Sequence, residues 1–272
     1  MTPQTQLTDI QALSRHRARA TAAGLFLQES AADEIKDRLS VVNRAFTQIA
    51  VVTPFAQVWS NSNPDARIVP DAEVIALEQN AHDLVIHALS LHWANDPVGQ
   101  LIQCRRSLRP DGLLMVATLG GQTLAELRSA LAEAEIALTG GLSPRVAPMG
   151  EIRDLGALLQ RAGLALPVAD SLSLQVEYRD AQHLMQDLRQ MGETNALAQR
   201  QRAIPSKRLF SEAARHYREN FTVPSGLVAA TFEMVFLTGW APDPSQQKPL
   251  RPGSAKHRLA EALKVPEVPL RD

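Results

Sequence analysis

The side chains best placed for chemistry are His92 and Trp93, which come soon after a predicted buried strand, Leu84–Ala88. In open α/β sheets, ligands bind at the edge formed by the carboxyl ends of the strands. An imidazole and an indole beyond such a strand are therefore candidate ligand contacts. The alternative is that Trp93 covers the top of the sheet and that His92 fixes the loop that follows.

The region before these residues lacks the glycines that a nucleotide site needs. No glycine occurs between Gly24 and Gly99. A nucleotide-binding loop turns tightly after the first strand and brings its backbone close to the ligand, which requires residues without a Cβ atom. The strand-like run in this region, Ile49–Val52, leads instead into Thr53-Pro54-Phe55. The sequence therefore predicts that the usual cradle is missing between Thr53 and Trp59.

The elements that position His92 and Trp93 form a predicted parallel crossover. After the first buried strand, Asp96 and Pro97 suit the N-cap and the first position of a helix. The predicted turn Arg109–Gly112 follows, and then a second buried strand over 113–117. A strand, helix, turn and strand within about thirty residues are typical of two parallel strands joined by a helix.

The flanking segments add further helices and strands to an α/β fold. Apolar spacing predicts a helix over 32–46, and 67–69 is a candidate brief strand. Thr123 and Glu126 have the spacing of a capping box at the start of a helix that ends at Gly140. Further helices are predicted at 151–161, 180–191 and 207–217, with strands at 172–178 and 227–237. We expect an N-terminal helical segment (1–46), an α/β domain (47–240) with a helical insertion at about 180–220, and an irregular tail (241–272).

Composition excludes several classes of function. The 272 residues are 45% apolar, which suffices for a sizeable core, and a formal charge of −1 gives no electrostatic footprint for nucleic acid. The one cysteine, Cys104, leaves no partner for an intramolecular disulfide and no cysteine-based zinc cluster, and we predict no metal site. No apolar run reaches the roughly 18 residues that span a bilayer, and no secretory signal is evident, so we expect a cytoplasmic protein without a transmembrane segment.

Three blocks of sequence together resemble a known family. They are Leu89–Pro97, then Leu108–Leu113 with Gly120–Arg128, and finally Thr238–Pro242 with Gln246–Lys256. The first two are similar to the fourth strand, following helix and fifth strand of class I S-adenosylmethionine-dependent methyltransferases, where a leucine-histidine-tryptophan signature and an RPDG-like turn recur. The glycine pair, Gly141–Arg145 and the last block resemble bacterial relatives of the mitochondrial NADH:ubiquinone oxidoreductase (complex I) assembly factor 5. The resemblance runs from about Leu7 to Leu263 and implies a Rossmann-like methyltransferase fold with a mostly parallel sheet.

The cofactor half departs from the pattern of this family. In such relatives the strand equivalent to Ile49–Val52 ends in an Asp-Leu-Gly type motif, and an acidic residue that closes the second strand binds the ribose. Only fifteen residues separate Val52 from Ile68. A loop, a three-turn helix, a turn and a strand need about 25 residues. We therefore expect that the second strand, its helix or both are missing or shortened, so that the fold is truncated in its N-terminal cofactor-binding half.

The resemblance also implies individual cofactor contacts. Ile68-Val-Pro-Asp71 looks like the third-strand motif whose aspartate meets the adenine amino group, and Leu91, His92 and Trp93 belong to the matching leucine-histidine-tryptophan block. The alternative for Asp71 is a turn or helix-capping residue. His87 stands where relatives often carry a small residue, and we expect a buried histidine satisfied by hydrogen bonds.

Three functions remain open at this point. The one we favour is a methyltransferase-fold protein that has lost S-adenosylmethionine binding, needs no cofactor and acts through protein contacts, as a pseudoenzyme in complex I assembly. Four basic residues would then meet an acidic partner: Arg145, Lys248, Arg251 and Lys256. The second is an active S-adenosylmethionine-dependent methyltransferase or a protein-arginine hydroxylase. The third is a non-catalytic subunit of a hetero-oligomer, and a homo-oligomer is also compatible with the sequence.

Overall fold

A six-stranded sheet organises the protein in the computed structural model, which describes residues 6–247. Its strands are β1 (Ile49–Val52), β2 (Arg67–Val69), β3 (His82–Ala88), β4 (Leu108–Leu119), β5 (Ala165–Tyr178) and β6 (Val228–Trp240). Their order in space is β2-β1-β3-β4-β6-β5. The pairs from β2 to β4 are parallel, and β6 runs antiparallel to both of its neighbours. This mixed sheet confirms the predicted Rossmann-like methyltransferase fold.

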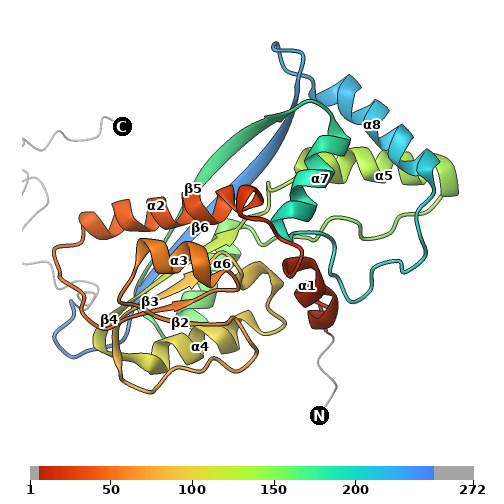
Figure 1. Ribbon diagram of the computed structural model, residues 1–272. Helices are drawn as coiled ribbons and strands as arrows, with labels where there is room; N and C mark the ends of the chain where they lie inside the picture. The colour runs from red at the N-terminus through yellow and green to blue at the C-terminus, as the bar shows by residue number, and fades with distance from the viewer. Residues whose placement is uncertain (1–5, 248–272) are drawn as a thin grey trace, which may run out of the picture. The chain divides into compact units, whose positions relative to one another are not determined.

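Helices cover both faces of the sheet. The core on one face includes residues of α2 (Phe26–Ser40), α3 (Ala56–Ser62), α5 (Ala125–Thr139), α7 (Ala181–Met191) and α8 (Lys207–Phe221). The core on the other face includes residues of α4 (Pro97–Ser107) and α6 (Ile152–Arg161). In Figure 1, α2 and α4 lie on opposite sides of the sheet. Within residues 6–247, no helix has the length and apolar character needed to cross a bilayer.

The crossover that carries His92 and Trp93 forms as predicted. Asp96 caps α4, because its side chain accepts a hydrogen bond from the Gly99 amide at 2.8 Å, and Pro97 takes the first helical position. The helices predicted at 151–161 and 180–191 form as α6 and α7. The capping residues and the apolar spacing of α4, α6 and α7 were enough to predict these three helices.

Tertiary contacts override three of the predicted boundaries. Residues 109–112 lie inside β4 rather than in a turn before it, because Leu108 pairs with His82 and Leu113 with Leu84, which leaves four residues opposite one. The capping box is wrong, since α5 starts after Leu124 and the Thr123 hydroxyl instead accepts a hydrogen bond from a strand amide of β6. The helix predicted over 32–46 spans 26–40 as α2, and Val42 and Phe46 beyond it pack against the core from a loop.

The N-terminal half of the sheet is short, as predicted. β1 pairs directly with β2, which has three residues, and the seven residues of α3 make the connection between them. No strand lies between β1 and β2 in the described sheet. The spacing between Val52 and Ile68 therefore reflects a genuine loss of structure on the side of the sheet where a nucleotide unit is expected.

The N-terminal helix α2 belongs to the same core as the sheet. Leu27, Ala31 and Ile35 of α2 pack in one cluster with Val51 of β1 and Phe236 of β6. The chain divides into two units after Pro242, and every element named above belongs to the first unit. The expected division into 1–46, 47–240 and 241–272, with an insertion at about 180–220, stays a prediction.

Candidate functional site

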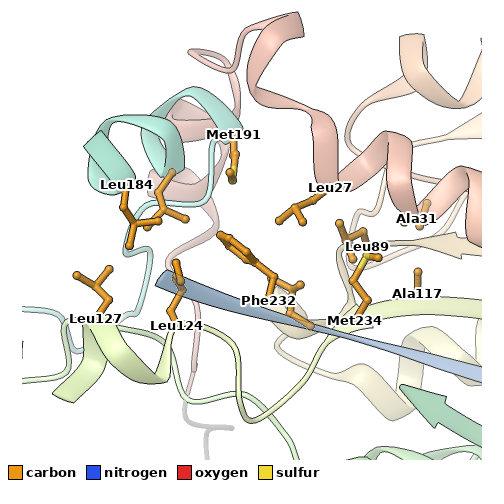
Figure 2. Close-up of a cluster of buried hydrophobic side chains, with 14 of the residues drawn as sticks. Leu27, Ala31, Leu89, Ala117, Leu124, Leu127, Leu184, Met191, Phe232 and Met234 are labelled. Atoms are coloured by element: carbon orange, nitrogen blue, oxygen red, sulfur yellow. The ribbon is translucent and has the colours of Figure 1, made fainter. Parts of the chain in front are cut away.

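Leu89 begins the loop at the carboxyl end of β3 in a left-handed conformation. Its φ is 42°, in a region that costs a residue with a Cβ atom about 1–2 kcal/mol. Figure 2 shows its side chain within the core, near Leu27 and Ala31 of α2. Its carbonyl oxygen accepts a hydrogen bond from Gln28 Nε2 at 3.4 Å. These contacts hold Leu89 in the turn that leads into the short 3-10 helix η2 (Leu91–Trp93).

The helix η2 places His92 and Trp93 against one carboxylate, that of Glu193. Glu193 follows α7, which ends at Gly192 with a φ of 78°. Its Oε2 atom accepts a hydrogen bond from Trp93 Nε1 at 2.6 Å and lies 3.2 Å from His92 Nε2. The side chains of His92 and Glu193 are 2% and 11% exposed. The structure therefore brings the two predicted residues together around an acidic side chain of the same chain, whereas Leu91 is buried in a different apolar cluster from Trp93.

The surroundings of Glu193 keep it ionised. Burial by itself would raise the pKa of Glu193, but the charges of His92 and Arg17 and the hydrogen bonds from His92 and Trp93 outweigh burial, so that this pKa is lowered. Sequence reasoning missed Glu193, which is 100 residues from Trp93 along the chain. The local pattern marks only the end of a helix at this point, so no signal in the sequence indicated its role.

Asp71 lies just beyond β2, where the third-strand motif predicts it, and its carboxylate is already bound. The Nη1 atom of Arg17, the last residue of α1 (Ile10–Arg17), lies 2.9 and 3.2 Å from the two carboxylate oxygens. Both side chains are 12% exposed. A ligand that used Asp71 would have to displace a mostly buried ion pair, which leaves the guanidinium without its counter-charge.

The N-terminal arm, which is residues 6–17 and carries Arg17, is hydrogen-bonded to the same carboxyl edge of the sheet. The backbone amide of Thr8 donates to Asn95 Oδ1 at 2.8 Å, in the loop after η2. Asp9 caps α1 and forms an ion pair with Arg200 at 2.9 Å. The arm therefore joins the carboxyl edge of the sheet to the loop that follows Glu193.

Trp59 of α3 packs in one apolar cluster with β1 and α2, on the face of the sheet that α2 covers. The loop before it is pinned, since the Thr53 amide donates to the Val69 carbonyl at 2.9 Å. Trp59 is fully buried in the same cluster as Val51, and its Nε1 donates to Gln28 Oε1 at 3.0 Å. A buried indole with its one polar atom satisfied has the environment of a core residue.

A small cavity lies beside Leu89 at this edge. It measures about 10 Å³ and is lined by residues that include Leu25, Gln28, Leu89, Met191 and Glu193. That is room for about one water molecule, whereas small-molecule sites measure about 300–1,000 Å³. A groove of about 340 Å³ lies between α2 and α3, but its lining includes neither the strands nor the predicted cofactor residues. Neither of these two spaces is both large enough for a small molecule and lined by the predicted cofactor residues.

His87 of β3 is a core histidine. Its Nε2 lies 2.8 Å from Gln100 Oε1, and the Gln100 amide nitrogen donates in turn to the Ala72 carbonyl. This network assigns the imidazole proton to Nε2. Burial lowers the pKa of His87 and so favours the neutral ring. The expectation of a buried histidine satisfied by a hydrogen bond is confirmed at Nε2.

Several buried polar atoms near this edge have no hydrogen-bond partner in the described part of the chain. They are Nε and Nη2 of Arg17, Nδ1 of His87 and of His92, and Oγ of Ser90. Buried polar atoms are normally hydrogen-bonded, so each of these requires a water molecule or a small ligand. No three His, Cys, Asp or Glu side chains converge as metal ligands in that same part of the chain. The unpartnered atoms are the feature of this edge that packing alone does not explain.

Of the four residues predicted to contact a partner, Arg145 lies within the described part of the chain. Arg145 Nη2 lies 2.6 Å from Glu135 Oε1 and 3.1 Å from Gln201 Oε1. Burial opposes ionisation of Glu135, but its pKa is lowered by Arg145 and by hydrogen bonds from Ser143. Arg145, in the loop after α5, is thus bonded to side chains of its own chain. Its contact with an acidic partner stays a prediction. The other three predicted contacts, Lys248, Arg251 and Lys256, lie outside the described residues.

Known proteins are similar to this chain over most of its length. A family model described as a methyltransferase domain matches residues 23–116. The arginine-hydroxylase NDUFAF5, mitochondrial, of Danio rerio is 37% identical over 225 residues, which are 83% of this chain and 70% of that protein. The human protein of the same name is 38% identical over 202 residues, 74% of this chain and 58% of that protein. The malonyl-(acyl-carrier protein) O-methyltransferase of Laribacter hongkongensis is 34% identical over 188 residues, 69% of this chain and 61% of that protein.

The similarities to solved structures are more distant. The protein BH2331 of Bacillus halodurans gives a TM-score of 0.48 at 12% identity and covers 77% of this chain and 98% of its own. Phosphoethanolamine N-methyltransferase 2 of Haemonchus contortus gives a TM-score of 0.42 at 10% identity and covers 78% and 53%.

Proposed function

Because the chain belongs to the class I S-adenosylmethionine-dependent methyltransferase-like family related to NDUFAF5, we propose that it acts in respiratory complex I assembly through protein contacts. In this proposal it does so as a pseudoenzyme, in the cytoplasm, without binding S-adenosylmethionine. A fold of this kind can host many functions or none, so the argument depends on the carboxyl edge itself. The observation that carries the proposal is that side chains of the chain itself occupy this edge: Arg17 binds Asp71, and Trp59 fills the space behind β1.

The ion pair between Arg17 and Asp71 would lower the affinity for a cofactor that used the Asp71 carboxylate. Removing one partner of a buried ion pair costs about 3–5 kcal/mol, because the other charge stays buried without compensation. Each 1.4 kcal/mol corresponds to about a tenfold change in affinity. A nucleotide that took the Asp71 carboxylate from Arg17 would therefore bind about a hundredfold more weakly, or worse, than at an open site of the same chemistry.

Calorimetric titration of the full chain with S-adenosylmethionine and S-adenosylhomocysteine tests the cofactor half of the proposal. We expect no saturable binding at millimolar ligand. Phosphoethanolamine N-methyltransferase 2 of Haemonchus contortus, whose solved structure contains S-adenosylhomocysteine, is titrated with the same ligand stocks as the positive control. Saturable binding in the micromolar range by this chain would overturn the proposal.

Co-purification tests the assembly half. The full chain, tagged and expressed at its native level, should be recovered with subunits of a complex I-type enzyme, and its deletion should reduce the amount of assembled enzyme. Charge reversal of Arg145 is an unsuitable probe because this side chain also holds Glu135 inside the fold. Recovery of the chain without any such subunit, together with normal assembly in the deletion strain, would contradict this half.

The unpartnered buried atoms of Arg17, Ser90 and His92 favour one alternative, which is an active enzyme. They supply unused hydrogen-bonding capacity at the edge where this fold class binds ligands. The relatives named arginine-hydroxylase suggest a protein-arginine hydroxylase, and the methyltransferase domain suggests methyl transfer with S-adenosylmethionine as cofactor. Mass spectrometry of the co-purified proteins separates the two candidates from the main proposal. An arginine that carries an added oxygen or methyl group only when the chain is present would establish the alternative.

A further inference from the structure

The strand β5 forms one edge of the sheet and is long for that position. It has 14 residues, whereas most strands have about 5–6. β6 pairs with its inner side. Within residues 6–247, no strand pairing or backbone hydrogen bond joins β5 to any element except β6. Its outer row of amide and carbonyl groups is therefore available to another strand.

Apart from two acidic side chains, the features that normally protect an edge are confined to the first residues of β5. Pro167 and a shift in register between Ala165 and Val168 interrupt the pairing there. From Val168 to Tyr178 the register is continuous, and this stretch contains no lysine, arginine or proline. Native proteins commonly blunt an open edge with lysine, proline or a bulge, since the edge otherwise pairs with another chain. The absence of these features over 168–178 indicates an edge that is meant to be covered.

The two acidic side chains of this stretch do not prevent the strand from pairing with its own copy. Asp170 is held by Arg38 at 2.5 Å, and Glu177 accepts a hydrogen bond from Ser225 at 2.8 Å. Being an odd number of residues apart, the two acids point to opposite faces of the sheet. Residues directly opposed in an antiparallel pair share a face. Asp170 therefore never opposes Glu177 of a second copy.

We propose that β5 is a homodimer interface, in which it pairs with β5 of a second copy of this chain in antiparallel orientation. A two-fold axis perpendicular to the sheet makes a strand antiparallel to its own copy, and such an interface is complementary to itself. The two sheets then form one continuous sheet through β6, β5 and the corresponding strands of the second copy. This inference is independent of the proposed function, because it does not involve the carboxyl edge.

One register pairs the whole uninterrupted stretch and places Ser173 on the axis. Val168 then opposes Tyr178 of the second copy, and Leu172 opposes Leu174. The leucines lie on the face that packs against the core, so the opposed pair extends an apolar surface that already exists. On the other face, Ser171 opposes Gln175, and both of these uncharged side chains are exposed.

Two double variants of the full chain test this register. They differ only at position 175, where one has a lysine and the other a glutamate. In Ser171→Lys with Gln175→Lys, two ammonium groups oppose each other on both sides of the axis. In Ser171→Lys with Gln175→Glu, each ammonium group opposes a carboxylate. Within one copy the two positions are about 13 Å apart along the strand, too far to pair, so that the variants differ mainly across the interface. Circular dichroism and thermal unfolding check that both are folded.

Sedimentation equilibrium of the wild type and both variants gives the result. We expect a dimeric wild type, a dissociation constant raised about tenfold or more in the lysine-lysine variant, and a constant close to that of the wild type in the lysine-glutamate variant. Amide exchange within 168–178 should slow with rising protein concentration. A wild type that stays monomeric at high micromolar concentration would overturn the proposal, as would equal weakening of the dimer by both variants.

Discussion

Trp59 decides whether the space behind β1 is a ligand site or part of the core. We predict that Trp59→Ala lowers the free energy of unfolding by about 3–5 kcal/mol, because it opens a large cavity and leaves the Gln28 Oε1 atom without its donor. Urea unfolding at neutral pH measures the change. Val58→Ala, on the half-buried neighbour in the same helix, is the control and should cost about 1 kcal/mol or less. Equal effects of the two substitutions would show that Trp59 lines an open pocket.

The ionisation of Glu193 makes the stability of the folded protein depend on pH. Because the pKa of Glu193 is lowered in the folded protein, its ionised form contributes stability above the unfolded-state pKa of about 4.3. That contribution is lost as the pH falls through the lower, folded-state pKa. We predict that Glu193→Gln destabilises the protein near neutral pH by about 1–3 kcal/mol, and that the difference from the wild type shrinks between about pH 5 and about pH 3.

Urea midpoints of wild type and variant across this pH range check the prediction. Glu78→Gln is the control, since Glu78 is exposed and has no ion-pair partner among the described salt bridges. Its effect on the urea midpoint near neutral pH should be small. A Glu193→Gln variant whose deficit stays constant down to the lowest pH would contradict the role of the ionised carboxylate.

At the scale of the element, the end of α7 fixes where Glu193 can lie. Gly192 has a φ of 78°, and a Cβ atom at this position would come within 2.9 Å of the Arg17 backbone. Gly226 has a similar φ of 81° but open space around it. We predict that Gly226→Ala costs about 1–2 kcal/mol from the backbone alone, and that Gly192→Ala costs more because α1 must also move.

Thermal unfolding of the two glycine variants, with amide exchange over α1, tests this difference. Exchange within 10–17 should be faster in Gly192→Ala and unchanged in Gly226→Ala. Equal destabilisation of the two variants, with α1 equally protected in both, would mean that the contact between α7 and α1 has no energetic weight.

The same elements separate what local sequence determines from what it does not. Asp96 and Pro97 start α4 because a cap and a proline act within one turn, and the edge position of His92 and Trp93 follows from the strand before them. Thr123 fails as a cap because its hydroxyl bonds to β6 instead, more than a hundred residues later. The site divides in the same way. Asp71 could be placed from its motif, whereas Arg17 and Glu193 act there only because the folded chain brings α1 and α7 to the sheet.

At the scale of the molecule, α2 and the sheet share one core and should unfold together. Trp59 and Trp93 lie in different apolar clusters. We predict that tryptophan fluorescence and far-ultraviolet circular dichroism give the same urea midpoint, as expected for a single cooperative transition. Amide exchange of α2 should also report the same opening free energy as that of β4. Exchange of α2 through a separate, cheaper opening would support an independent segment at 1–46.

The position of β6 has a consequence for how the protein is made. β6 is the last described strand along the chain, yet it lies between β4 and β5. A ribosome delivers β5 before its only described neighbour exists, and at about 5–20 residues per second the translation of α7 and α8 keeps β5 waiting for several seconds. During that interval the nascent chain exposes a long open strand. A message truncated before Val228 would therefore leave β4 and β5 without the strand that joins them, rather than yield a smaller domain that folds, so folding of the described sheet requires translation through β6.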